Sequence, residues 1–136
     1  MERKRIFSGT EWESRVGYSR VVQAGSAVHV SGTTATDDDG NVVGNDDPYE
    51  QTKQALRNIE NAYTETDASL EDVVRTRMFV TDIDEWEAIG DAHREVFGDV
   101  RPTTSMVEVN RLIDPALSVE IEAIAIVSDQ AVSLSE

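Results

Sequence analysis

Three hydroxyl side chains stand together in the segment Arg101 to Val109, which reads RPTTSMVEV. They follow Pro102 and lead directly into a β-rich run. Because a hydroxyl can both donate and accept a hydrogen bond, the segment either lines a ligand pocket or simply begins a strand. Strand alternation separates two faces: Thr104, Met106 and Glu108 on one, and Thr103, Ser105, Val107 and Val109 on the other.

One carboxylate and two imidazoles are the other groups that could move protons. Glu120, in the run VEIEA, could relay protons to and from water or could face solvent in a strand. His93 and His29 could each shuttle a proton, although a histidine on a helix stripe is more often a partly buried core residue. With two histidines and no cysteine, a catalytic zinc site is not expected, and disulfides and thiolate catalysis are excluded. We expect no metal and no cofactor.

The net charge of the chain limits the classes of partner that we expect it to bind. Its 136 residues fit one domain, residues 1–136, with 27 Asp and Glu against 12 Lys and Arg, a formal net charge of -15. Such a surface repels phosphate backbones, so nucleic acid is not an expected partner. The acidity is typical of proteins from a salt-rich cytoplasm, with an acidic protein of a mesophile as the alternative. The chain has no run long and apolar enough for a signal peptide or a membrane span, and we expect a cytoplasmic protein.

The hydrophobic pattern predicts alternating strands and helices. We expect strands over 5–8, 18–23, 26–32, 73–81, 103–109 and 117–127, and helices over 48–66 and from 85 to 97. Asp47 and Pro48 are typical of a helix start. The inward stripes are predicted to be Tyr49, Thr52, Leu56, Ile59 and Tyr63 in the first helix, and Trp86, Ile89, His93 and Val96 or Phe97 in the second.

Two helices can cover only one face of such a sheet. The last strand places apolar residues on both of its faces, because Ile124 and Ile126 lie opposite Ala123 and Ala125. An apolar face without a helical cover indicates self-association.

These elements, with a set of short motifs, resemble a known family. The motifs are Gly17-Tyr18-Ser19, the run 28–32 (VHVSG), Asp47 to Asn58, Val73 to Asp82, Phe97 to Val109 and the run 119–123 (VEIEA). In this order they are similar to the RidA/YjgF family of reactive-intermediate deaminases, also called L-PSP endoribonucleases or translation inhibitors. The resemblance implies an α+β, chorismate-mutase-like fold of order β-β-β-α-β-α-β-β, with one mixed sheet and two helices on one face. It also implies a homotrimer with small-molecule clefts between subunits.

The resemblance assigns candidate site residues and also shows a departure. In the family, an arginine in a P-A-R-S segment binds the substrate carboxylate, and a glutamate in the last strand positions or activates water. That glutamate corresponds to Glu120, and the cleft would be lined by Tyr18, Ser31, Gly32, Gly90, Thr104 and Met106. Here the segment reads Pro102-Thr103-Thr104-Ser105, so Thr104 replaces the arginine, and Gly90 stands where an asparagine is common. Arg101 could substitute for the arginine, or could be a surface residue.

Three functions are open on this basis. The first is a hydrolase that deaminates a small enamine or imine other than a simple carboxylate imino acid, because Thr104 offers only a neutral hydrogen bond. The second is a non-catalytic trimer that binds a small metabolite. The third is the ribonuclease or translation-inhibitor role, which the charge of -15 disfavours.

Overall fold

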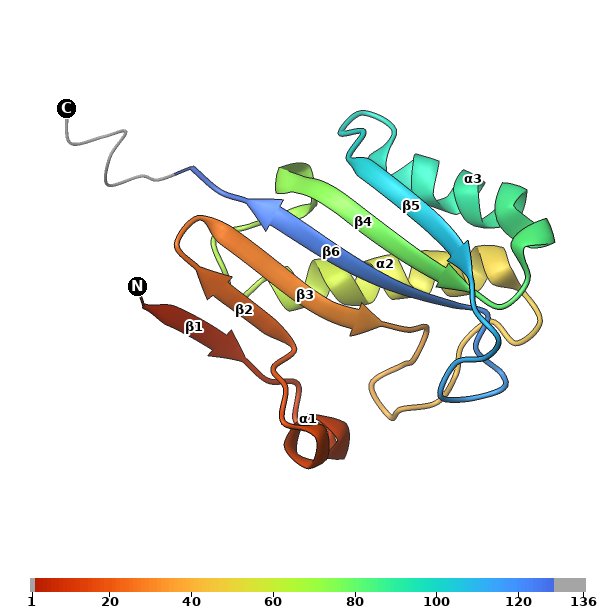
Figure 1. Ribbon diagram of the computed structural model, residues 1–136, viewed down its shortest axis with the longest axis horizontal. Coiled ribbons are helices and arrows are strands. Elements are labelled where there is room, and N and C mark those ends of the chain that lie inside the picture. Colours follow the sequence, from red (N-terminus) through yellow and green to blue (C-terminus); the bar gives the residue numbers. More distant parts are fainter. Residues whose placement is uncertain (1, 129–136) are drawn as a thin grey trace.

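The computed structural model describes residues 2–128, which form one six-stranded sheet with two long helices on one face (Figure 1). The elements in chain order are β1 Arg3–Ile6, α1 Glu11–Val16, β2 Val21–Ala24, β3 Ala27–Thr33, α2 Pro48–Tyr63, β4 Val73–Val80, α3 Trp86–Phe97, β5 Thr103–Glu108 and β6 Val119–Ile126. The sheet order is β1-β2-β3-β6-β4-β5. Only β4 and β5 run parallel, so the sheet is mixed, and the predicted α+β class is confirmed.

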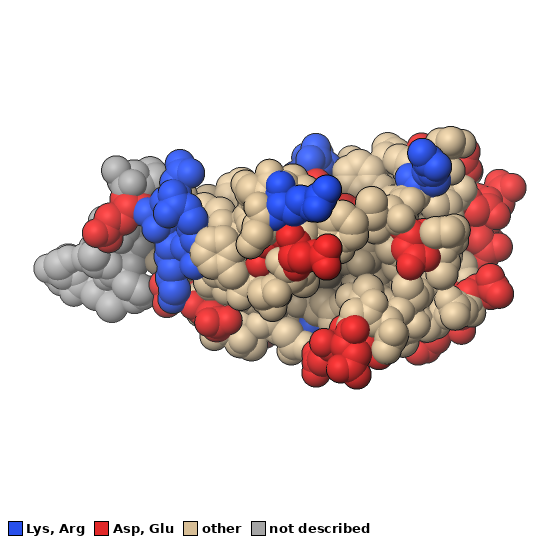
Figure 2. Space-filling view, turned by 90° about the horizontal axis from the view of Figure 1, so that it is seen from below, with Lys and Arg blue, Asp and Glu red and all other residues tan. Residues whose placement is uncertain are grey.

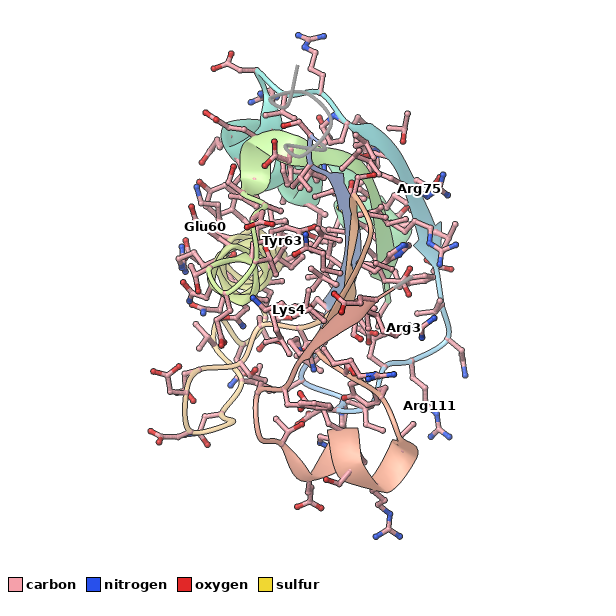
Figure 3. The ribbon with its side chains drawn as sticks, turned by 90° about the vertical axis from the view of Figure 1, so that its left-hand side faces the viewer. Arg3, Lys4, Glu60, Tyr63, Arg75 and Arg111 are labelled. Atoms are coloured by element: carbon pink, nitrogen blue, oxygen red, sulfur yellow. The ribbon has the colours of Figure 1, made fainter. Side chains whose placement is uncertain are left out.

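The last strand, β6, lies at the centre of the sheet between β3 and β4. Val119, Ile121, Ala123 and Ala125 are buried beneath the helices, and the residues between them lie on the other face. Figure 3 shows the sheet edge-on, with Tyr63 pointing from α2 toward it and Arg75 projecting on the side without helices. The predicted two-faced character of this strand is therefore confirmed, and we call the second side the helix-free face.

The start of α2 follows the predicted signals. Asp47 accepts a hydrogen bond from the backbone N–H of Glu50, and Pro48 occupies the first helical position. Of its predicted inward stripe, Thr52, Leu56, Ile59 and Tyr63 are buried. Tyr49 is only half-buried, and its hydroxyl donates to Glu95 on α3 at 2.5 Å. The prediction of Tyr49 as a core residue is wrong, because a polar partner on the neighbouring helix holds the ring at the surface.

The start of α3 departs further from the predicted pattern. A short 3-10 turn, Ile83–Glu85, precedes the helix, with Asp82 accepting from the backbone N–H of Asp84. Ile89 and Phe97 are buried, whereas Trp86, the first residue of α3 after this turn, is 56% exposed. The prediction of Trp86 as an inward residue is therefore wrong.

The sequence reading missed the six-residue helix α1 between β1 and β2. The Glu13 side chain is buried on this helix and accepts hydrogen bonds from the backbone N–H groups of Ser8 and Gly9. Gly17 ends the helix in the left-handed conformation, with φ at 89°. The chain therefore reverses direction here and delivers Tyr18 and Arg20 to the end of the sheet where β3 finishes.

Candidate functional site

The carboxylate of Glu120 lies directly over the backbone of Gly32. A Cβ atom at Gly32 would overlap one carboxylate oxygen, so only glycine leaves room for the acid at this point. The register of β3 against β6 is irregular between Val30 and Thr33, which places Gly32 in a local distortion of the strand. Glu120, on the helix-free face of β6, is half-buried there.

Burial is the main reason that the pKa of Glu120 is raised above its ordinary value. The nearby Glu122 carboxylate raises this pKa further, and the positive charge of Arg20 opposes the rise. A carboxyl group with a raised pKa exchanges protons closer to neutral pH than an exposed carboxyl group does. Glu120 therefore has the electrostatic setting of a group that can accept and return a proton.

Arg20 connects the other predicted residues to this acid. Its guanidinium donates to the carbonyl oxygen of Gly32 at 3.0 Å and lies 5.7 Å from the centre of the Tyr18 ring. Its backbone carbonyl accepts from the N–H of Ser31, and the Ser31 hydroxyl donates to the carbonyl of Ser19 at 2.6 Å. Tyr18, Ser31, Gly32 and Glu120 thus come together, and we call them with Arg20 the Glu120 group.

Glu13 forms an ion pair with Arg20 and so positions it. Its carboxylate is 3.6 Å from Nε of Arg20, and the glutamate is only 4% exposed. Burial acts to raise the pKa of Glu13, but hydrogen bonds from Ser8 and Gly9, with the charge of Arg20, outweigh it and lower that pKa. Arg20 is therefore a positioned cation between two carboxylates.

Thr104 belongs to a second cluster, on the other face of the sheet. It pairs with Thr76 across the parallel strands β4 and β5, and the two hydroxyl oxygens are 2.5 Å apart. The Nε2 atom of His93, from α3, lies 2.9 Å from the Thr76 hydroxyl and 3.5 Å from that of Thr104. Met106 follows on the same side of β5 and packs against the core.

Gly90 lies three residues before His93 in α3, and a Cβ atom at this position would meet nothing within 4 Å. The structure therefore leaves open space at Gly90 and does not bring this residue into contact with the cluster. We call Thr76, His93, Thr104 and Met106 the Thr104 group.

The two groups are separate within one chain. Glu120 lies on the helix-free face of β6, whereas Thr104 points to the helix side from β5, with β4 between these strands. A small molecule in contact with one group cannot touch the other group of the same chain. In the part of the chain that the structure describes, no three His, Asp or Glu side chains come close enough to hold a metal ion.

Known proteins share this arrangement of elements. The sequence model described as Endoribonuclease L-PSP matches residues 9–127. The chain belongs to this family, which is also called YjgF or RidA. An uncharacterized protein from Streptomyces coelicolor is 42% identical over 122 residues, covering 88% of this chain and 90% of the relative.

Two solved structures of this fold are informative. A Mycobacterium tuberculosis member of the YjgF/YER057c/UK114 family is 51% identical, with a TM-score of 0.84, and the match covers 93% of this chain and 100% of the other. TdcF from E. coli, solved with bound serine, is 29% identical, with a TM-score of 0.75 and coverage of 82% and 88%. The predicted family and fold are thus confirmed.

In this RidA/YjgF chain, Arg101 is held at the turn that follows α3, and its backbone N–H donates to the carbonyl of Phe97. It adopts a left-handed backbone conformation, with φ at 53°, and its Nε donates to the carbonyl of Gly98 at 3.2 Å. This contact favours a role at the turn after α3 over a substitute for the missing arginine. Arg20, Thr76 and Glu13 escaped the sequence reading, because their importance comes from contacts between segments distant in the chain.

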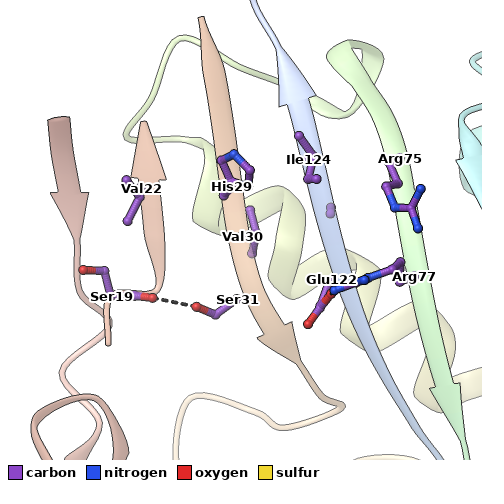
Figure 4. A pocket seen from close by; sticks show the side chains of 10 residues that line it. Ser19, Val22, His29, Val30, Ser31, Arg75, Arg77, Glu122 and Ile124 are labelled. Carbon is purple, nitrogen blue, oxygen red and sulfur yellow. Dashed lines mark hydrogen bonds and ion pairs between the residues drawn. The ribbon is translucent and has the colours of Figure 1, made fainter. Parts of the chain in front are cut away.

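A hollow of about 280 Å³ lies beside the Glu120 group on the helix-free face (Figure 4). Ser31 belongs to both, and the walls include His29, Arg75 and the ion pair of Arg77 with Glu122, at 2.6 Å. Opposite charges thus line a surface that the chain's own helices leave uncovered.

No helix among residues 2–128 combines the length and apolar character that crossing a membrane requires.

Proposed function

We propose that this chain is a RidA-like hydrolase that converts a small imine or enamine to a carbonyl compound and ammonia, without a cofactor. The observation that carries the proposal is Glu120, a half-buried carboxylate with a raised pKa held over Gly32 and beside Tyr18 and Ser31. Water adds to the C=N carbon while Glu120 accepts one water proton and returns it to the nitrogen, which gives a carbinolamine. Glu120 then transfers the hydroxyl proton of this carbinolamine to the same nitrogen, as the C–N bond breaks and the C=O bond forms. The sum is one imine and one water giving one carbonyl and one ammonia.

The active assembly is proposed to be a closed homotrimer in the cytoplasm. Each site would combine the Glu120 group of one copy with the Thr104 group of the next, because one chain holds them on opposite faces. The helix-free face offers exposed apolar side chains for such a contact, with Val107 46% and Ile126 45% exposed. Sedimentation of the purified protein as a monomer at all accessible concentrations would overturn this part.

The substrate is proposed to lack the carboxylate of a simple imino acid. Serine, which TdcF holds, carries a carboxylate, whereas the Thr104 group offers no cation at its open end. Replacing a bidentate arginine by one hydroxyl weakens carboxylate binding by about 2 kcal/mol or more. Small metabolites with a neutral polar group are thus the proposed substrates.

Ammonia release is the direct test of this hydrolase. Purified protein is assayed with short-lived imino acids and with neutral imines, next to a Glu120→Gln variant, which keeps the size of the side chain but not its basicity. We expect faster ammonia release from at least one neutral imine, and loss of that rate in Glu120→Gln. The absence of acceleration with every compound would overturn the proposal.

A non-catalytic metabolite-binding trimer is the second candidate, favoured by the uncharged Thr104 group. Ligand-dependent rises in the melting temperature that persist in Glu120→Ala, without turnover by the parent protein, would support it.

The ribonuclease activity in the family's name is the weakest candidate, because the net charge is -15. Figure 2 shows acidic side chains scattered over one face of the molecule and gathered around one end, with Lys and Arg side chains gathered toward the other end. RNA cleavage at low salt that disappears in Glu120→Gln would restore this candidate.

A further inference from the structure

A chain of three hydrogen-bonding groups leads from α3 to the surface beside β5. His93 is half-buried, with its ring 4.8 Å from that of Phe97, and its Nε2 touches the Thr76 hydroxyl. Thr76 is fully buried, at 0% exposure, and its hydroxyl touches that of Thr104, which is exposed. The Thr104 hydroxyl is therefore the only one of the three that lies at the open end.

The proton on His93 fixes the direction of the whole chain. A threonine hydroxyl has one hydrogen, so Thr76 can donate to only one of its two neighbours and must accept from the other. If Nε2 carries the hydrogen, it donates to Thr76, Thr76 donates to Thr104, and the Thr104 O–H is free to point outward. If Nδ1 carries the hydrogen instead, Thr76 donates to Nε2 and Thr104 donates to Thr76. The Thr104 oxygen then presents only lone pairs to the outside.

We propose that His93, through Thr76, makes the Thr104 hydroxyl an outward hydrogen-bond donor that selects substrates with a neutral carbonyl-type oxygen at this position. The inference rests on the proposed function and deepens it. In the opposite orientation, Thr104 would present lone pairs to the ligand, and the Glu120 carboxylate would also present lone pairs from the other half of the cleft. A C=O group accepts hydrogen bonds only, so it requires the donor.

The surroundings of His93 keep the ring neutral. Burial lowers the pKa of His93 below its ordinary value. The charged neighbours of His93 on α3 form ion pairs with other residues: Arg94 with Asp91, and Glu95 with Lys53 of α2. Its partners on β4 and β5 are hydroxyls, and Arg75 and Arg77 line the hollow on the helix-free face. A neutral ring places no cation behind Thr104, in contrast to the arginine of the family pattern.

Two matched ligands test the selectivity without any turnover. Pyruvate and 2-oxopropanamide differ only in a carboxylate against a carboxamide, and their affinities are measured by NMR titration at about pH 8, where the ring is neutral. We expect tighter binding of the amide, and roughly five- to tenfold weaker amide binding in Thr104→Val, Thr76→Val and His93→Phe. Thr104→Ser keeps the hydroxyl and should bind the amide as the parent does.

Combining His93→Phe with Thr104→Val should weaken amide binding no further than either change alone, because both break the same chain of hydrogen bonds. Parent-like amide binding in both His93→Phe and Thr76→Val would overturn the inference. So would a preference for pyruvate, or binding of neither compound.

The ring nitrogens of His93 give an independent readout. The chain has two histidines, so ¹⁵N spectra of histidine-labelled protein are assigned with a His29→Gln variant. We expect the Nε2–H tautomer in the parent, and a shift toward Nδ1–H in Thr104→Val, where Thr76 has lost its acceptor. The Nδ1–H tautomer in the parent, or no change in Thr104→Val, would overturn the relay. Because none of these measurements needs catalysis, failure of the hydrolase proposal would leave them decisive.

Discussion

Gly32→Ala should move the Glu120 carboxylate without removing it. The new Cβ would overlap one carboxylate oxygen and would lie 2.9 Å from Cδ and 3.3 Å from Cγ of Glu120. Contacts between a methyl carbon and such atoms settle at roughly 3.5 Å, so the carboxylate must shift by about 1 Å. The backbone itself tolerates alanine, because Gly32 has no positive φ.

The expected effect is large on the rate and small on stability. A displacement of about 1 Å in a catalytic group costs on the order of 100-fold in rate, equivalent to about 2.7 kcal/mol of activation free energy. The free energy of unfolding should change by less than about 1 kcal/mol, because the obstacle is the end of a flexible side chain. Steady-state ammonia release and urea unfolding of the same preparation measure the two quantities.

A double-mutant cycle with Glu120→Ala supplies the control. Once the carboxylate is gone, the alanine at position 32 has nothing to displace, so the double variant should match Glu120→Ala in rate. A Gly32→Ala protein that turns over within twofold of the parent, while Glu120→Ala is inactive, would refute the reasoning.

Further predictions concern charge. Burial, and then the Glu122 charge, raise the pKa of Glu120 in the folded state, so ionisation of Glu120 destabilises the fold. Glu120→Gln should therefore raise the midpoint of urea unfolding at pH 7. This gain should vanish below about pH 4, where Glu120 is protonated in both the folded and the unfolded states. The pKa of Glu13 is lowered instead, so its ionised carboxylate stabilises the fold at neutral pH, and this stabilisation is lost as pH falls through the folded-state pKa. Glu13→Ala should therefore lower the free energy of unfolding by about 2–3 kcal/mol at pH 7. A change below about 0.5 kcal/mol would contradict the hydrogen-bond network with Ser8 and Gly9. With a net charge of -15, the parent's melting temperature should rise between about 0.1 and 1 M KCl, and a flat or falling response would argue for the alternative of an acidic mesophile protein.

The sequence predicted the sheet and its long helices because the relevant signals are local. Alternation in the last strand correctly separated Ile121 and Ala123 from Glu120, and the cap at Asp47 correctly began α2. The predictions that Trp86 and Tyr49 point inward were wrong for a different reason. Periodicity gives the spacing of an apolar stripe but not the point at which the stripe ends. Trp86 is the first residue of α3, after a 3-10 turn, and Tyr49, near the start of α2, donates a hydrogen bond to Glu95 on the neighbouring helix.

The candidate site was predictable only where a motif carried it. The resemblance nominated Glu120 and Gly32, and the structure gives a physical reason for the pair, since the acid occupies the space that a Cβ would fill. Nothing local marks Arg20 or Thr76 as partners of these residues. Arg20 owes its position to α1 and Glu13, and Thr76 owes its importance to the parallel register of β4 with β5.

The division of the site between copies can be tested by mixing two inactive proteins. Glu120→Gln disables one half of a site, and Thr104→Trp blocks the other half with bulk. If each site joins halves from neighbouring chains, random reassociation of equal amounts places an intact Glu120 against an intact Thr104 in about a quarter of the sites. Co-refolded mixtures should therefore regain about a quarter of the parent's ammonia release, whereas each variant refolded alone should regain none. If both halves of a site came from one chain, no mixture could be active, because every chain would carry one defect.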